Sequence, residues 1–161
     1  MTEVLYLGHI VDQEGIKISP DRMRAIREYP IPRCVRDVRA FLGMVNYHRQ
    51  FFDNWSNIIV PLTKMTKKCV NFKEEFGPEQ IDCVNKIKEL VSTLPTLIHF
   101  DPSLPIRVKT DSNGYGMGAK LEHLINGKWL PVLHISKKMT EREQNYGISE
   151  KECLAIVFAT N

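Results

Sequence analysis

Ile106–Arg107–Val108–Lys109–Thr110–Asp111–Ser112, with the glycine-spaced run Gly114–Tyr115–Gly116–Met117–Gly118–Ala119 behind it, organises the second half of this chain. Apolar and basic residues alternate in the first segment, which predicts a half-buried strand. Turn residues follow, and the alternation then resumes, so the second segment is predicted to be a strand paired with the first. Asp111 comes where the first strand should end, and the sheet would hold its carboxylate in a fixed position.

Two interpretations of Asp111 stay open at this point. An aspartate before a Ser-Asn-Gly turn is usually a turn residue without a catalytic role. It could also be a metal ligand, provided that a second carboxylate lies nearby. The glycines do not indicate a phosphate-binding loop, because no Gly-Lys-Ser/Thr follows them and no helix start is present.

Length and composition exclude several classes of protein. The 161 residues suffice for one compact domain or two small ones, and 43% hydrophobic with 25% charged residues is typical of a soluble globular protein. No apolar run approaches the ~18 residues of a membrane span, and the first residues do not resemble a signal peptide. The four cysteines form no Cys-x-x-Cys pair, which favours reduced, partly buried thiols and argues against zinc. We therefore expect an intracellular protein, cytoplasmic or nuclear, without membrane contact.

Basic residues are concentrated in the first half of the chain. Between Pro20 and Lys68 there are ten lysines and arginines against four acids, whereas the whole chain has a net charge of only +3. Such a bias is compatible with a surface that faces phosphates, and equally with ordinary solvated helix faces. Aromatic residues at positions 47, 51, 52 and 55 lie among these bases. They could stack on nucleic-acid bases, but packing between helices is the commoner role.

The first half is predicted to be a β-hairpin followed by four helices. Residues 4–11 and 16–18 form the hairpin, with a turn at 13–15. Ser19 and Pro20 start the first helix, and Pro30 stops it. The second helix starts near Cys34–Val35, a third spans about 58–65, and a fourth runs from Gly77–Pro78 to Pro95.

The second half begins with a predicted linker at 96–105, where we place a domain boundary. After the Asp111 hairpin, Asn126–Gly127 is a tight-turn signal, and residues 129–135 give a third strand. Pro131 argues for an edge or a bulge there. The last helix is predicted from about Ser149, with Ser149 as cap and Glu152 as its capping-box partner. Glu152 could instead point toward the strand end that holds Asp111.

Several dispersed segments, in the same order along nearly the whole chain, resemble the reverse transcriptases of Gypsy-type LTR retrotransposons just after the polymerase palm. Those in the first half are Tyr6–Leu7–Gly8–His9–Ile10–Val11, Ser19–Pro20, Val38–Arg39–Ala40–Phe41–Leu42–Gly43–Met44–Val45–Asn46–Tyr47–His48–Arg49 and Pro61–Leu62–Thr63. Those in the second half are similar to the start of the RNase H domain: Thr110–Asp111–Ser112, Gly116–Met117–Gly118–Ala119, His134–Ile135–Ser136–Lys137, Glu143–Gln144–Asn145–Tyr146 and Glu150–Lys151–Glu152–Cys153–Leu154–Ala155.

The resemblance implies a layout and an α+β fold. Residues 1–95 would be the end of the palm, to about residue 18, and a helical thumb-like bundle. Residues 96–161 would be the amino-terminal part of an RNase H-like mixed sheet with one helix. The implied partners are a template–primer duplex or RNA–DNA hybrid and the remainder of the Pol polyprotein. The residues expected to contact nucleic acid are Arg22, Arg36, Arg39, Tyr47, Arg49, Lys64, Lys67 and Lys68.

The resemblance also makes Asp111 the first catalytic carboxylate and Glu152 the second, both as Mg²⁺ ligands. Two Mg²⁺ ions roughly 4 Å apart suit hydrolysis of an RNA phosphodiester, and Mg²⁺ prefers carboxylates and water. The third and fourth ligands of the family, and the polymerase aspartates, are not among these residues. We therefore expect nucleic-acid binding without either reaction. The alternatives are an inactive relic of an element and a non-catalytic binding module recruited by a host.

Overall fold

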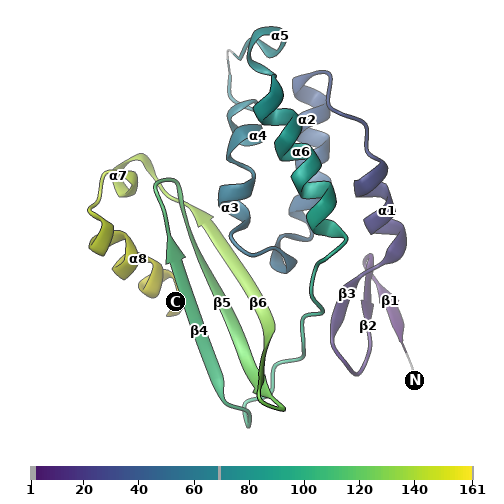
Figure 1. Ribbon diagram of the computed structural model, residues 1–161, viewed down its shortest axis with the longest axis vertical. Helices are drawn as coiled ribbons and strands as arrows, with labels where there is room; N and C mark the ends of the chain where they lie inside the picture. The colour runs from purple at the N-terminus through teal and green to yellow at the C-terminus, as the bar shows by residue number, and fades with distance from the viewer. Residues whose placement is uncertain (1–2, 69, 161) are drawn as a thin grey trace.

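The computed structural model describes residues 3–68 and 70–160 of the chain (Figure 1). Six helices and a small sheet form one part, and a larger sheet with two helices forms the other. Each sheet has three antiparallel strands in sequential order. This architecture confirms the predicted α+β fold.

The part that we call the helical part contains β1 Val4–Tyr6, β2 His9–Val11, β3 Ile16–Ile18, α1 Pro20–Glu28, α2 Val35–Asn46, the 3₁₀ turn Arg49–Phe51, α3 Trp55–Ile58, α4 Val60–Lys64, α5 Phe72–Glu75 and α6 Pro78–Val91. The second part contains the large sheet, β4 Ile106–Ser112, β5 Gly116–Ile125 and β6 Lys128–Lys138, followed by α7 Glu141–Gln144 and α8 Ile148–Thr160.

The amino-terminal sheet has one more strand than we predicted. Leu7 and Gly8 have φ values of +49° and +81°, so the chain reverses between β1 and β2. Consecutive residues with positive φ make the two-residue turns that join antiparallel strands. Leucine rarely adopts this conformation, which is why residues 4–11 looked like one continuous strand.

Most helices of the helical part begin where the sequence predicted. The Ser19 hydroxyl accepts a hydrogen bond from the backbone N–H of Arg22, and Pro20 is the first residue of α1. The predicted third helix is instead two short helices, α3 and α4, which meet at Ile59. Pro61 explains the break, because it has no N–H to donate to the carbonyl four residues earlier.

One large hydrophobic core holds the helical part together. Phe52 and Trp55 belong to it, and the Trp55 indole N–H donates to the Asn46 side chain at 2.6 Å. Phe51 is buried in a smaller cluster with Ile18 and Leu97. Packing is therefore the role of these three aromatic residues. The buried members of the large core are Ile26, Val38, Phe41, Leu42, Val45, Phe52, Trp55, Leu62, Met65, Cys83, Val84, Ile87 and Val91.

The predicted linker contains no helix or strand, but it does pack on the small sheet. Leu97 is buried and exchanges two backbone hydrogen bonds with Ile16, at 2.7 and 3.0 Å. Gly15 lies so close that an added Cβ would be 2.1 Å from the Leu97 carbonyl oxygen. The chain is thus fixed at Leu97 before it enters β4. The division into domains at residues 95 and 96 stays a prediction.

In the large sheet, the turn and the irregularity predicted from the sequence are both present. Asn126 and Gly127 have positive φ and join β5 to β6. The register shifts between Leu121, which pairs with Leu133, and Glu122, which pairs with Pro131. Proline cannot donate to the ladder, and the bulge accommodates it.

The two faces of the large sheet have different neighbours. Met117 packs in a cluster with Met139 and with Ala155 of α8. Gly116 and Gly118 point to the other face, where the segment 49–57 of the helical part lies. An added Cβ at Gly118 would be 2.6 Å from the Asn54 side-chain oxygen, so a larger residue there would push the Asn54 amide aside.

Two hydrogen bonds complete this junction. The Ser56 backbone N–H donates to the Ser136 hydroxyl at 3.2 Å. The buried His134 ring contacts the Gln50 carbonyl oxygen through Nδ1 at 3.0 Å. Since Ser136 and His134 lie opposite Gly118 and Lys120, all of these contacts are on one face of the sheet.

The carboxyl-terminal helices depart from the prediction. α8 begins at Ile148, and the Glu150 carboxylate accepts the Gly147 backbone N–H at 2.7 Å. Ser149 therefore lies inside the helix, and the capping box predicted for Ser149 and Glu152 is wrong. The short α7, which we did not predict, has such a box between Thr140 and Glu143.

None of the helices among residues 3–68 and 70–160 is both long and apolar enough to cross a membrane. Cys83 is buried, and burial raises the pKa of its thiol to about 11, whereas Cys34 and Cys153 are exposed. Cys69 lies outside the described residues.

Two histidines join the small sheet to the helices. His9 Nε2 and His48 Nδ1 are 3.0 Å apart, and the His9 ring stacks on Tyr47 and Phe51. His48 is only 1% exposed. Burial, with smaller contributions from His9 and Arg22, lowers the pKa of His48 from 6.5 to about 4.

We predict that acidification from pH 7 to pH 5 weakens the fold through His48. Because the pKa of His48 is lower in the folded chain, the unfolded chain binds a proton at a higher pH than the folded chain does. The contribution of neutral His48 to the free energy of unfolding is therefore complete above pH 6.5 and is lost as the pH falls toward 4. Urea denaturation should show a loss of about 2 kcal/mol over this interval. His48→Gln should reduce that slope, and the remainder should come from His9 and His134, whose pKa values burial also lowers; an unchanged slope in the variant would contradict the prediction.

Glu122 is a buried carboxylate surrounded by bases. It is 3% exposed, and Arg107 donates two hydrogen bonds to it at 2.6 and 2.9 Å. Lys120 lies 3.1 Å from its other oxygen, and the Arg107 guanidinium also covers the Trp129 ring at 4.1 Å. Burial alone would raise the pKa of Glu122, but the hydrogen bonds from Arg107 and Lys120 outweigh it and lower the pKa.

We predict that Glu122→Ala lowers the free energy of unfolding by about 2–4 kcal/mol at pH 7, because it leaves partly buried cations without their partner. Glu141→Ala, at an exposed position, is the matched control and should change it by less than about 0.5 kcal/mol. Thermal or urea unfolding measures both. Equal effects of the two substitutions would show that the Glu122 cluster does not stabilise the sheet.

Candidate nucleic-acid interface and carboxylate site

All eight residues predicted to contact nucleic acid are exposed in the structure. They do not form one continuous surface, and three regions can be distinguished. The first lies beside the small sheet, the second along α2 and the end of α4, and the third in a cleft between the helical part and the large sheet. Their role in binding stays a prediction.

Beside the small sheet, Arg22 and Tyr47 have local partners. The Arg22 side chain packs against Gly8 in the turn between β1 and β2. The Tyr47 ring stacks on His9 with centroids 5.3 Å apart, although the residue is about half exposed. Tyr47 could therefore offer its outer face to a ligand without losing its inner contact.

Along α2, Arg36 and Arg39 are exposed on the same helix. Arg39 donates from Nη2 to the Thr66 carbonyl oxygen at 2.9 Å, which ties α2 to the segment where Lys67 and Lys68 follow. Arg39 thus has a structural role that the sequence did not show.

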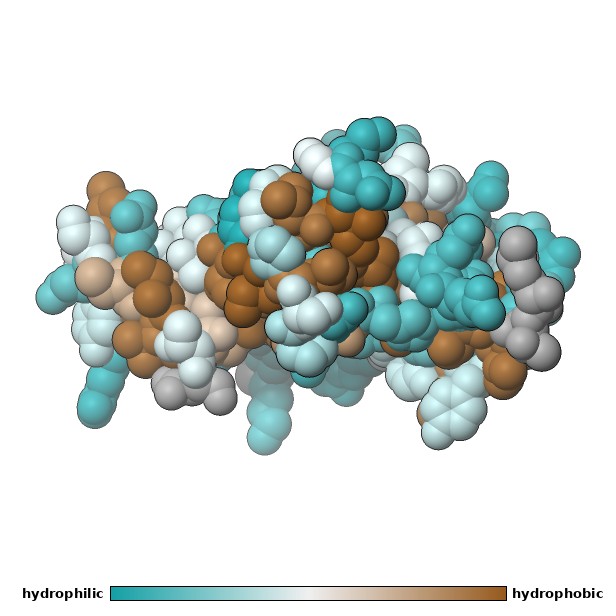
Figure 2. Space-filling model, turned by 90° about the horizontal axis from the view of Figure 1, so that it is seen from below, coloured by the Kyte–Doolittle hydropathy of each residue, from teal (hydrophilic) through white to brown (hydrophobic). Residues whose placement is uncertain are grey.

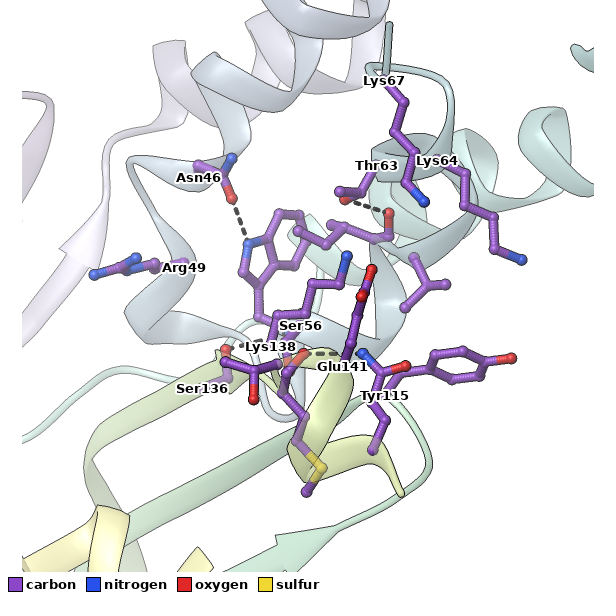
Figure 3. A pocket seen from close by; sticks show the side chains of 16 residues that line it. Asn46, Arg49, Ser56, Thr63, Lys64, Lys67, Tyr115, Ser136, Lys138 and Glu141 are labelled. Carbon is purple, nitrogen blue, oxygen red and sulfur yellow. Dashed lines mark hydrogen bonds between the residues drawn. The ribbon is translucent and has the colours of Figure 1, made fainter. Parts of the chain in front are cut away.

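The third region is a cleft of about 540 Å³, which we call the basic cleft (Figure 3). Arg49, Lys64 and Lys67 line it from the helical part, and Lys138 lines it from the end of β6. Figure 3 shows Lys64 and Lys67 on one side, with Tyr115 and Lys138 on the other. Among the described residues, no carboxylate forms a salt bridge with any of these four bases.

Lys138 and Tyr115 are two cleft residues that the sequence analysis did not single out. Lys138 follows Lys137 at the end of a strand, and Tyr115 sits in the glycine run. The Lys-Lys pair was a visible signal, but only the fold shows that this end of the sheet faces α4.

Asp111 is at the end of β4, as predicted, and its side chain is engaged by the helical part. The Asn54 side-chain amide donates to Asp111 Oδ2 at 2.8 Å. Asn54 has a left-handed backbone with φ of +50°, which asparagine tolerates better than most residues. A smaller cleft of about 210 Å³ surrounds this contact and is lined by Asp53, Asn54, Lys109, Thr110, Asp111, Gly118, Ala119 and Lys120.

Glu152 is exposed on α8 and has no capping role. Asp111 pairs with Gly118 across β4 and β5, so it points to the face that carries the segment 49–57. α8 packs on the opposite face, against Met117. The two carboxylates could therefore bind one metal ion only if both side chains reached past the edge of the sheet at β4. A metal site shared by Asp111 and Glu152 stays a prediction.

The described residues do not fit a complete metal centre. Within residues 3–68 and 70–160, no three His, Cys, Asp or Glu side chains gather closely enough to hold an ion. One Asp111 oxygen already accepts the Asn54 amide proton. This arrangement supports no metal-dependent step in the described part of the chain.

The chain is similar to regions of larger proteins over almost its whole length. It is 38% identical over 158 residues to the retrovirus-related Pol polyprotein from transposon 297 of Drosophila melanogaster, covering 98% of this chain and 14% of that protein. It is 34% identical to the corresponding polyprotein from transposon gypsy of the same species and 32% identical to the transposon Tf2-3 polyprotein of Schizosaccharomyces pombe. Each of these two alignments covers 97% of this chain, but only 16% of the gypsy polyprotein and 12% of the Tf2-3 polyprotein. The chain therefore spans a small part of the length of the curated relatives that it matches.

Solved structures have the same fold. The foamy viral protease-reverse transcriptase in complex with dsDNA gives a TM-score of 0.81 at 23% identity, over 99% of this chain and 33% of that one. The same protein in complex with an RNA/DNA hybrid gives 0.78 at 22% identity, over 98% and 21%.

A protein-family model described as "RNase H-like domain found in reverse transcriptase" matches residues 76–161. This match covers more than half of the chain and agrees with the resemblance noted in the sequence. The chain therefore belongs to the family of RNase H-like domains found in reverse transcriptases.

Proposed function

We propose that this chain is the thumb and the beginning of the RNase H-like domain of a retrotransposon reverse transcriptase, and that it binds template–primer duplex or RNA–DNA hybrid. The observation that carries the proposal is the basic cleft, where four cations from both parts of the chain surround one space and form no salt bridge with any described residue. Solvated cations that face a common opening are suited to phosphates.

Binding of this kind is electrostatic and depends little on sequence. Lysines and arginines that neutralise phosphates release condensed counterions, and affinity then falls steeply with salt. Phosphate contacts position a protein on nucleic acid without reading bases. The foamy viral protease-reverse transcriptase is in complex with dsDNA in one of these structures and with an RNA/DNA hybrid in the other, and the shared fold supports the same classes of ligand for this chain.

The proposal assigns Asp111 and Glu152 to the RNase H carboxylates of the parent enzyme, with Mg²⁺ as the implied ion. The family membership supports this assignment. Among the described residues, however, no three metal-ligating side chains lie close enough together to hold an ion at either carboxylate. We therefore propose that this 161-residue chain binds nucleic acid but does not cleave it.

We predict that the triple variant Arg49→Ala, Lys64→Ala, Lys67→Ala weakens binding to a duplex and flattens its salt dependence. Each lost phosphate contact should reduce the slope of log K against log salt by about 0.9. Fluorescence anisotropy across a salt series measures this slope.

The matched control is Lys73→Ala, Lys86→Ala, Lys88→Ala, which removes the same charge from α5 and α6, outside the basic cleft. It should leave the slope nearly unchanged. A wild-type plot that is already flat, or equal losses in the two triple variants, would refute a role of the cleft in phosphate binding.

We predict that the chain shows no detectable cleavage of an RNA–DNA hybrid in the presence of Mg²⁺. Carboxylates that do not surround the ion gain little over its hydration shell, which Mg²⁺ gives up reluctantly. A gel assay with labelled RNA measures cleavage. Mg²⁺-dependent products that disappear in Asp111→Asn would overturn the prediction.

A further inference from the structure

The basic cleft contains an aromatic side chain that binding to phosphates does not require. Tyr115 lies between Gly114 and Gly116 at the tip of the β4–β5 hairpin and is 51% exposed. Its ring reaches the cleft from the side of the large sheet (Figure 3). Unlike Phe51, Phe52 and Trp55, it belongs to none of the hydrophobic clusters of the described residues.

The hairpin holds Tyr115 in place through its backbone. The Tyr115 N–H donates to the Asn113 side chain at 2.9 Å, and the Tyr115 carbonyl accepts the Met139 N–H, also at 2.9 Å. Replacing the side chain leaves both hydrogen bonds intact. The exposed ring therefore contributes little to folding and is available to a ligand.

The walls of the cleft combine apolar and cationic groups. Trp55, Ile59, Val60 and Met139 supply apolar surface beside Tyr115. The bases Arg49, Lys64, Lys67 and Lys138 surround it, with Glu141 as the only acid among the lining residues. An apolar floor with an aromatic ring and a rim of cations matches a nucleotide, which has a flat base and a charged phosphate.

The size of the cleft further limits which ligands it can hold. Its volume of about 540 Å³ is within the range of pockets that take small molecules. A single nucleotide is a ligand of this size class, whereas a double helix is far larger than the cleft. A duplex can meet only its rim.

We propose that the basic cleft binds an unpaired nucleotide of a nucleic-acid strand, with the base stacked on Tyr115 and the flanking phosphates on Arg49, Lys64, Lys67 and Lys138. The inference rests on the proposed function and adds a substrate preference to it. A strand with an unpaired segment binds more tightly than a blunt duplex. Lys138 and Tyr115 make the large sheet part of the binding surface.

A single-stranded oligodeoxynucleotide carrying 2-aminopurine, and a blunt duplex of the same length, test this preference. Stacking on Tyr115 should quench the fluorescence of the single strand in the wild-type chain. Tyr115→Ala should weaken single-strand binding by roughly tenfold and abolish the quenching, since stacking on an aromatic side chain contributes about 1–3 kcal/mol per base. It should change duplex affinity by less than about twofold, and Tyr115→Phe should restore both single-strand signals.

Tyr146→Ala is the matched control, because Tyr146 is 44% exposed but does not line the basic cleft. It should leave every signal unchanged. If Tyr115→Ala alters neither affinity nor quenching, or weakens single strand and duplex equally, the nucleotide site is refuted while phosphate binding stands. If, in addition, the variant Arg49→Ala, Lys64→Ala, Lys67→Ala binds single strand and duplex as tightly as the wild-type chain, both the nucleotide site and the proposed function are refuted.

Discussion

The structure depends on the close contact between the segment 49–57 and one face of the large sheet. Gly116 and Gly118 have no side chains to keep the segment away, so Asn54 and Ser56 reach the sheet surface. The Ser136 hydroxyl and the His134 ring add hydrogen bonds from β6. Figure 2, the view from below, shows apolar side chains exposed in the middle of that face and smaller apolar groups toward both ends, with polar groups between them. The connecting segment around Leu97 also joins the two parts, through its backbone hydrogen bonds to Ile16.

The glycine contact also determines where the candidate sites lie. It places the tip of the β4–β5 hairpin and the end of β6 opposite α4, which creates the basic cleft from residues far apart in the sequence. It brings the Asn54 amide to the Asp111 carboxylate as well. One packing arrangement therefore forms both the cation-lined space and the environment of the predicted carboxylate.

Much of this fold was predictable from local patterns. Ser19 and Pro20 predicted the start of α1, and the apolar spacing of residues 35–45 predicted α2. Pro131 predicted the irregularity in β6 that the structure shows opposite Glu122. The turn at Leu7 was not predictable, because leucine gives no signal for a positive φ. The partners of Asp111, and the face of the sheet on which it lies, depend on contacts between distant segments. Strand alternation places Asp111 at a strand end but does not say which element covers that face.

The hydrogen bond between Asn54 and Asp111 has a mechanical consequence. Asn54 immediately precedes α3, and its left-handed backbone leaves it little freedom to follow a displaced partner. A strand that moved the helices away from the sheet would stretch this bond along with the other hydrogen bonds of the junction. The Asp111 carboxylate would then lose the Asn54 amide as a hydrogen-bond donor. Occupancy of the space beside α4 would in this way be communicated to the end of β4.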